Sequence, residues 1–210
     1  MVGLCAGTIA IWIVLVSTSS AQKSPGTPYP EVCRRATESV VQVRSCGGTG
    51  SGVVMDTGLV VTSISLVGPC DTAWVLQDGR NYQAHVVVRD ASTGVAVLKV
   101  DSLDLPPLQL GNSDSLEVSQ LVLAVQVDAH KALEWGPRPL CTLGVVSGLD
   151  RKAGGLEGLI LTDVPLVPGG RGGALVDAKG RLVGILSFKD PKISRLSYAV
   201  PVDRIKSLLR

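Results

Sequence analysis

Leu161-Thr-Asp-Val-Pro-Leu-Val-Pro-Gly-Gly-Arg-Gly-Gly-Ala-Leu175 is a glycine-rich turn between two apolar runs, and the apolar segment Leu182-Val-Gly-Ile-Leu-Ser187 follows it. The turn contains Pro168 and the glycines at positions 169, 170, 172 and 173. Glycines so close together permit positive φ angles and allow neighbouring backbone N–H groups to point into one open site. The stretch therefore predicts two strands joined by a turn that presents backbone donors.

The composition of the whole chain agrees with a folded β-protein. Of its 210 residues, 45% are hydrophobic and 18% are charged, which excludes wholesale disorder. Only 3% are aromatic while glycine is abundant, which favours many short strands over a helical bundle. The formal net charge of +2 is too small to indicate a nucleic-acid or anionic membrane partner. No cysteine and histidine spacing suggests a metal site, and we expect no cofactor.

The first 21 residues have the pattern of an export signal. An uncharged apolar run from Leu4 to Val16 is followed by small residues, and Ser19 and Ala21 fit cleavage before Gln22. No basic residue precedes the run, so an uncleaved anchor is the alternative, and it is the one membrane contact that we expect. Either interpretation predicts an exported protein: secreted, periplasmic or bound to the cell envelope.

Removal of the signal would leave four cysteines, which allow three disulfide pairings. Cys46 and Cys70 lie at the ends of neighbouring elements in the first half of the chain, so we favour this pair. Cys33–Cys141 then follows by elimination. Buried free thiols are the alternative.

The order of elements predicts an all-β fold of two packed, six-stranded antiparallel β-barrels with a short helix at each end. Residues 22–38 form a linker and a short helix from Pro30 to Glu38, residues 101–116 form a connector, and residues 202–209 form a closing amphipathic helix. The strands of barrel 1 (39–100) are predicted at 39–44, 51–56, 59–63, 73–77, 81–89 and 95–100. Those of barrel 2 (117–201) are predicted at 120–127, 142–147, 159–163, 174–177, 181–188 and 196–201.

Several ordered blocks resemble HtrA/Deg-type, trypsin-like serine proteases of the peptidase S1 fold. The blocks are Gly50-Ser-Gly-Val-Val-Met-Asp-Thr-Gly-Leu-Val-Val-Thr62, Leu76-Gln-Asp-Gly-Arg80, Val88 to Lys99, Leu110-Gly-Asn-Ser-Asp-Ser-Leu116 and the glycine turn. The resemblance runs from Ser39 to Leu209 and implies the trypsin-like domain at 39–209. The chain ends after the 202–209 helix, so no PDZ domain is expected.

The resemblance also implies that the catalytic triad is lost. That chemistry needs a serine nucleophile, a histidine base and an orienting aspartate. The family's histidine position holds Ser65, its aspartate position Gly94 and its serine position Arg171. Of the two histidines, His85 is expected on a strand edge or surface and His130 in a solvated loop. The chain is therefore identified as a pseudoprotease homologue.

Other site residues follow from the same resemblance. The backbone N–H groups of Gly169 and Arg171 correspond to oxyanion-hole donors. The Arg171 side chain has three possible roles: folding onto Asp163 and closing the cleft, binding an anion such as a peptide C-terminal carboxylate, or pointing into solvent. Arg195 and Ser197 place side chains where family members have a glycine-lined slot.

Three functions remain open on the sequence. The leading one is an exported, catalytically inactive homologue that acts as a binding or regulatory module for an unknown protein or peptide. The second is an active or weakly active serine endopeptidase with a non-standard site. The third is a self-associating assembly subunit, which would make the protein a homo-oligomer.

Overall fold

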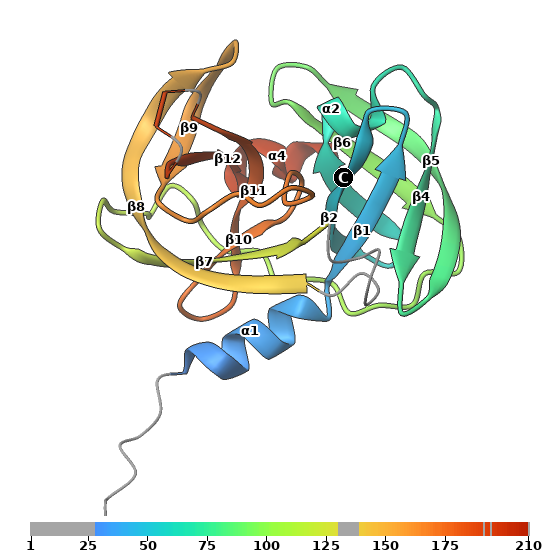
Figure 1. The fold of residues 1–210 in the computed structure, drawn as a ribbon, viewed down its shortest axis with the longest axis horizontal. Helices are drawn as coiled ribbons and strands as arrows, with labels where there is room; N and C mark the ends of the chain where they lie inside the picture. The colour runs from blue at the N-terminus through green and yellow to red at the C-terminus, as the bar shows by residue number, and fades with distance from the viewer. Residues whose placement is uncertain (1–27, 130–138, 191, 194, 210) are drawn as a thin grey trace, which may run out of the picture.

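The computed structural model describes residues 28–129, 139–190, 192–193 and 195–209, and within them the chain forms two closed β-barrels (Figure 1). The first barrel has the strand order β1-β2-β3-β6-β5-β4 and the second has β10-β11-β12-β9-β8-β7. Every pairing within the barrels is antiparallel. The predicted fold class is confirmed.

The twelve strands fall close to the predicted positions. Those of the first barrel are β1 (Val40–Ser45), β2 (Gly48–Asp56), β3 (Leu59–Ser63), β4 (Thr72–Gln77), β5 (Arg80–Asp90) and β6 (Val95–Val100). Those of the second are β7 (Leu121–Val127), β8 (Pro139–Ala153), β9 (Leu156–Thr162), β10 (Ala174–Asp177), β11 (Leu182–Lys189) and β12 (Ser197–Pro201).

The barrels form because valine and leucine recur along the strands and fill their interiors. Val41, Val60 and Leu98 are buried in the first barrel, and Val122, Ile160 and Leu186 are buried in the second. β-branched and leucine side chains suit the pleated, buried surface of a small barrel. A third cluster joins residues of both barrels, including Val53 and Val125, and this shared core fixes how the barrels meet.

Four short helices flank the barrels within the described part of the chain. The helix α1 (Tyr29–Thr37) packs on β7 and β8 through the buried side chains of Val32 and Ala36. The helix α2 (Ile64–Val67) follows β3, where no helix was predicted. The closing helix consists of one α-helical turn, α4 (Val202–Ile205), that continues as the 3₁₀ helix η1 (Lys206–Leu209). None of the described helices has the length and apolar character needed to cross a bilayer.

Both predicted disulfides are present. The Cα atoms of Cys33 and Cys141 are 5.8 Å apart, and those of Cys46 and Cys70 are 6.1 Å apart. The first disulfide ties α1 to β8, and the second closes the segment that contains α2. The predicted signal at 1–21 and His130 lie outside the described residues.

Candidate functional site: the cleft between the barrels

The glycine turn lies between β9 and β10 and is held by a serine of the other barrel. Ser51 on β2 is fully buried; its Oγ donates to the Gly169 carbonyl oxygen at 2.7 Å and accepts from the Val127 N–H at 2.8 Å. The Ser51 N–H donates to the Arg171 carbonyl oxygen at 2.8 Å. These bonds fix two carbonyl groups of the turn toward the first barrel.

Two backbone N–H groups of the turn have no acceptor among the residues that the structure describes. The Pro168 carbonyl oxygen accepts from the Ala129 N–H at 2.9 Å, and a planar trans peptide then directs the Gly169 N–H the opposite way. Gly169 has φ = 92°, a left-handed value that suits glycine. Neither the Gly169 N–H nor the Arg171 N–H has an acceptor within the described residues. The turn is thus suited to bind an anion or a polarised oxygen.

The buried side chain of Gln126 holds the start of the same turn by hydrogen bonds. Gln126 on β7 donates through Nε2 to the Pro165 carbonyl oxygen at 2.7 Å and accepts through Oε1 from the Val167 N–H at 3.2 Å. A Cβ atom at position 170 would overlap this Oε1 atom. A side chain at position 170 would therefore have to displace the Gln126 amide group.

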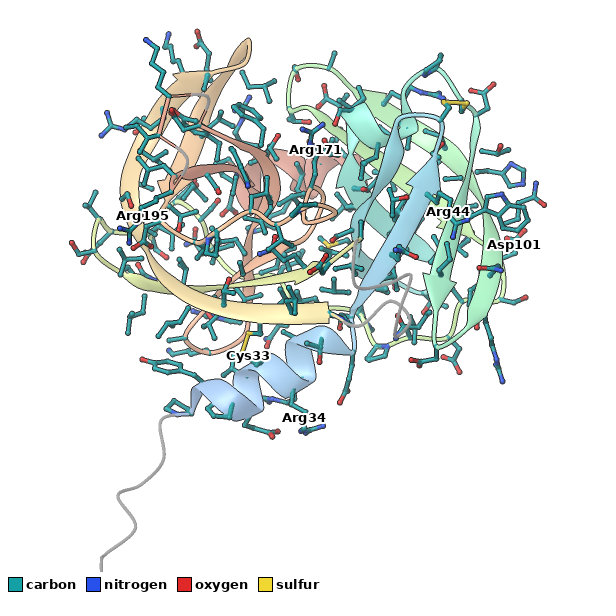
Figure 2. The ribbon with its side chains drawn as sticks, in the orientation of Figure 1. Cys33, Arg34, Arg44, Asp101, Arg171 and Arg195 are labelled. Carbon is teal, nitrogen blue, oxygen red and sulfur yellow. A yellow bond between two sulfur atoms is a disulfide. The ribbon has the colours of Figure 1, made fainter. Side chains whose placement is uncertain are left out.

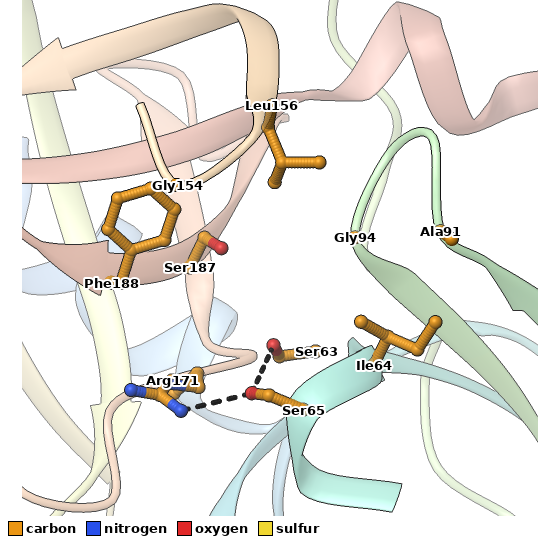
Figure 3. A pocket seen from close by; sticks show the side chains of 10 residues that line it. All are labelled: Ser63, Ile64, Ser65, Ala91, Gly94, Gly154, Leu156, Arg171, Ser187 and Phe188. Atoms are coloured by element: carbon orange, nitrogen blue, oxygen red, sulfur yellow. Dashed lines mark hydrogen bonds between the residues drawn. The ribbon is translucent and has the colours of Figure 1, made fainter. Parts of the chain in front are cut away.

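The Arg171 side chain contacts Ser65 across the cleft. Its Nη1 donates to Ser65 Oγ at 3.0 Å, and Ser65 Oγ lies 3.0 Å from Ser63 Oγ (Figure 3). Ser65 lies on α2 in the first barrel, whereas Arg171 lies on the turn of the second. Both side chains are exposed. Two of the three positions that the resemblance assigns to the triad are thus joined by a hydrogen bond.

Gly94, at the third position, follows a tight turn that begins at Asp90. The Gly94 N–H donates to the Asp90 carbonyl oxygen at 2.8 Å, and Gly94 has φ = 75°. The hydroxyl groups of Ser92 and Thr93, with the Ser92 N–H, bond to the Asp90 carboxylate and hold its pKa below the usual value. This carboxylate therefore stabilises the turn and does not reach the cleft. A Cβ atom on Gly94 would come within 2.7 Å of Leu156 Cδ1.

Ser65, Gly94 and Arg171 line one cavity of about 360 Å³. Ser63 and Ser187 add hydroxyl groups to it, and its apolar lining is Ile64, Ala91, Gly154, Leu156 and Phe188 (Figure 3). A second cavity of about 470 Å³ lies on the other side of Arg171, against the turn and the β1–β2 connection.

Among the residues that the structure describes, the lining of these two cavities has donors but no base. The described lining includes no histidine, aspartate or glutamate, and its charged groups are Arg171 and Lys189. A serine hydroxyl without an adjacent base is a poor nucleophile. The described residues of the two linings are chemically suited to bind a negatively charged group.

The structure places the other candidates elsewhere. Arg171 does not fold onto Asp163, because Asp163 Oδ1 accepts from the Val145 N–H at 2.7 Å while Arg171 bonds to Ser65. Ser197 is buried and donates to the Val164 carbonyl oxygen at 2.9 Å. Figure 2 shows Arg195 on the outer side of the second barrel, away from Arg171. Neither cavity beside Arg171 includes these three residues.

Some residues of the cleft were not recognised in the sequence. Ser51 was quoted within a block, but its contact with the turn depends on how the barrels meet. Gln126 lay inside an apolar run, where a single polar residue is a signal worth following. Leu156 and Phe188 carried no signal. His85, on β5, is exposed and lines neither cavity beside Arg171.

A double barrel with a glycine turn at the cleft between its halves is the architecture of trypsin-type peptidases, and here an arginine stands at the centre of that cleft. Residues 50–185 match the family described as the trypsin-like peptidase domain. The chain belongs to this family, and its similarities are to members of the HtrA/DegP type.

Relatives and solved structures agree with this assignment. A probable periplasmic serine endoprotease DegP-like of Halomonas elongata is 35% identical over 161 residues, which cover 73% of this chain and 33% of the relative. The putative serine protease HhoA of Synechocystis is 31% identical over 175 residues, covering 79% and 43%. The chain thus spans between a third and a half of the length of these two relatives.

Among solved structures, the serine endoprotease from Yersinia pestis has a TM-score of 0.74 at 28% identity, covering 88% of this chain and 66% of that one. An HtrA-type protease, AlgW, solved with a decapeptide, has the same TM-score and identity and covers 86% and 66%.

Proposed function

We propose that this chain is an exported, non-catalytic member of the trypsin-like peptidase family that binds a peptide or protein segment in the cleft between its barrels. One observation carries the proposal: the hydrogen bond from Arg171 Nη1 to Ser65 Oγ, 3.0 Å long, joins two positions at which active relatives are expected to hold nucleophile and base. A permanent cation therefore occupies the place from which a serine would attack.

Energetics favour binding over catalysis. Enzymes without their triad keep only about 10³–10⁴-fold acceleration over water, from oxyanion donors and substrate binding. The donors that would supply this residual acceleration are the N–H groups of Gly169 and Arg171. Both N–H groups are without an acceptor among the described residues. The chain thus keeps the binding part of the machinery. AlgW, with a similar fold, was solved with a decapeptide, which supports a peptide as the partner.

Export is part of the proposal. The relatives from Halomonas and Pseudomonas are named periplasmic, and both disulfides of this chain suit an oxidising compartment.

A weakly active serine peptidase is the second candidate, and a specific contact favours it. The Arg171 guanidinium donates to Ser65 Oγ, and a cationic donor would stabilise an alkoxide at that atom. The similar proteins are named as proteases, which also supports this candidate.

Probe labelling separates the two candidates. The full chain, secreted so that its disulfides form, is incubated with a fluorophosphonate probe and separately with unfolded casein, beside an active DegP-like relative. We expect no labelling and no casein fragments from this chain. Covalent probe on Ser65, located by mass spectrometry and lost in Ser65→Ala, would instead establish the peptidase.

A further inference from the structure

We infer that the 360 Å³ cavity beside Arg171 binds the C-terminal carboxylate of a peptide whose last side chain is apolar. The inference rests on the proposed function and names the chemical class of ligand for that site. It draws on the charge, the donors and the apolar walls of the cleft.

The charge of Arg171 is not neutralised within the described structure. Its side chain makes one hydrogen bond there, to the neutral Ser65 hydroxyl, and no ion pair. Among the described residues that line this cavity, it is also the one that carries a charge. Asp163, the partner expected from the sequence, and Asp90, at the start of the turn before Gly94, both accept hydrogen bonds from other groups. An anionic ligand would thus meet an uncompensated guanidinium.

The donors beside Arg171 suit a carboxylate. A carboxylate has two oxygens that accept about four hydrogen bonds, and a guanidinium can donate to both oxygens at once. Only one guanidinium contact is used within the described chain, to Ser65, which leaves Nη2 and Nε free. The Arg171 backbone N–H also lacks an acceptor among the described residues. The hydroxyl groups of Ser63 and Ser65 lie at the same end of the cavity (Figure 3).

The remaining walls select the rest of the ligand. Ile64, Leu156 and Phe188 line the cavity with apolar side chains. A phosphate or sulfate has no apolar part to bury there, and an internal peptide segment has no carboxylate at its backbone. A peptide C-terminus that ends in a residue such as leucine carries both a carboxylate and an apolar side chain on the same Cα atom. The cavity lies at the small end of the usual range for ligand sites, about 300–1,000 Å³, which fits one residue.

The experiment compares one peptide with and without its terminal charge. An N-acetylated, fluorescein-labelled pentapeptide ending in Ser-Ala-Leu is prepared as the free acid and as the C-terminal amide. Binding to the full chain is followed by fluorescence anisotropy at low salt. We expect the free acid to bind about ten-fold or more tightly than the amide, because a charged hydrogen-bond pair is lost in the amide.

Variants assign the effect to the cleft. Arg171→Gln should weaken binding of the free acid by a similar factor and leave binding of the amide unchanged. The effects of the substitution and of amidation are then not additive. Arg44→Gln is the matched control, since Arg44 is exposed on β1 and lines neither cavity. It should leave both affinities unchanged. Circular dichroism of each variant confirms that the barrels are intact.

Different results overturn different statements. Equal binding of acid and amide, or unchanged binding by Arg171→Gln, overturns the carboxylate site while the non-catalytic function stands. Octanoate that displaces the peptide acid at an equal concentration overturns the peptide as the ligand source. Cleavage of the peptide during the measurement, detected by mass spectrometry, overturns the proposed function itself.

Discussion

At two glycines beside the cleft, an added Cβ atom would meet a neighbouring side chain. At Gly94 the backbone has φ = 75°, and a Cβ atom would approach Leu156 Cδ1 to 2.7 Å. At Gly170 a Cβ atom would overlap Gln126 Oε1. Position 94, which the resemblance assigns to the aspartate of the triad, is thus closely packed, and a side chain there would have to move Leu156.

Gly94→Asp should lower the free energy of unfolding by about 1–3 kcal/mol, since a strained φ angle and a close contact are both introduced. Urea denaturation measures the change. The same substitution in a Leu156→Ala background should cost less, because the contact is relieved and only the φ strain remains. An equal cost in both backgrounds would show that Leu156 does not restrict position 94.

Ser51→Ala should lower the free energy of unfolding by about 1–3 kcal/mol, because the buried N–H of Val127 and the carbonyl oxygen of Gly169 each lose a partner. Ser115→Ala is the control, since Ser115 is exposed and its Oγ bonds only to the nearby Asn112 carbonyl oxygen. We expect a change below about 0.5 kcal/mol for the control. Equal urea midpoints for Ser51→Ala and Ser115→Ala would contradict the role given to Ser51.

At the scale of elements, the strands could be predicted from the sequence and one helix could not. The strands β3, β6 and β10 begin and end at the predicted residues, because runs of valine and leucine bounded by glycine or aspartate have few alternatives. The helix α2 is a single turn rich in β-branched residues, and such a sequence favours a strand. It forms in the folded protein because Gly47 donates to the Leu66 carbonyl oxygen at 2.9 Å and the Cys46–Cys70 disulfide closes the segment.

The strand β8 shows a second limit of sequence interpretation. Its predicted part, Thr142 to Ser147, lies within a strand that runs from Pro139 to Ala153. The extension contains Gly148, Asp150 and Arg151, residues that are typical of turns. Pairing with β9, with register shifts at three places, keeps this part extended. Such tertiary pairing leaves no local signal.

The two disulfides should contribute differently. Their cysteines are separated by 108 and 24 positions, and in the chain-entropy model a longer loop gives more stability. Cys33→Ser with Cys141→Ser should therefore lower the free energy of unfolding by about 1 kcal/mol more than Cys46→Ser with Cys70→Ser. Urea denaturation of the two double variants tests this order. By contrast, hydrogen exchange of the α2 amides should increase more in the Cys46 and Cys70 variant, and the reverse pattern would contradict this account.

At the scale of the whole molecule, one carboxylate connects the closing helix to the connector between the barrels. Asp203 on α4 accepts from the Ser113 hydroxyl group at 2.7 Å and from the Ser113 N–H, and it pairs with Lys206. Burial alone would raise the pKa of Asp203, but the hydrogen bonds from Lys206 and Ser113 outweigh it, so the pKa lies below its usual value. The carboxylate is therefore more stable charged in the folded state than in the unfolded chain.

This shift predicts an acid-dependent stability. A depressed folded-state pKa gives stability that is full above the unfolded value of about 3.9 and is lost as pH falls through the folded value. Asp203→Asn should thus lower the melting temperature at pH 7, and its difference from the wild type should shrink as the pH falls toward 2.5. Asp104→Asn, which removes an exposed carboxylate, is measured beside it as the control. A gap between wild type and Asp203→Asn that stays constant from pH 7 to pH 2.5 would contradict the linkage.

The cleft could be located from the sequence but its contacts could not. The order of blocks placed Ser65, Gly94 and Arg171 around one site, and the structure brings all three to one cavity. The partner of Arg171 was open among Asp163, a ligand anion and solvent, because the choice depends on α2. That short helix turns the Ser65 hydroxyl toward the guanidinium, and no local pattern indicates it.

The hydrogen bonds of Ser51 to the glycine turn make the shape of the cleft depend on the order of events during folding. Ser51 comes from the amino-terminal barrel and the turn from the carboxyl-terminal one, so the final shape of the turn is reached only when the two halves have assembled. A ligand that recognises that shape does not bind a chain whose two barrels have not yet packed together. Its binding then favours assembly of the two halves, by the same free energy with which assembly favours binding.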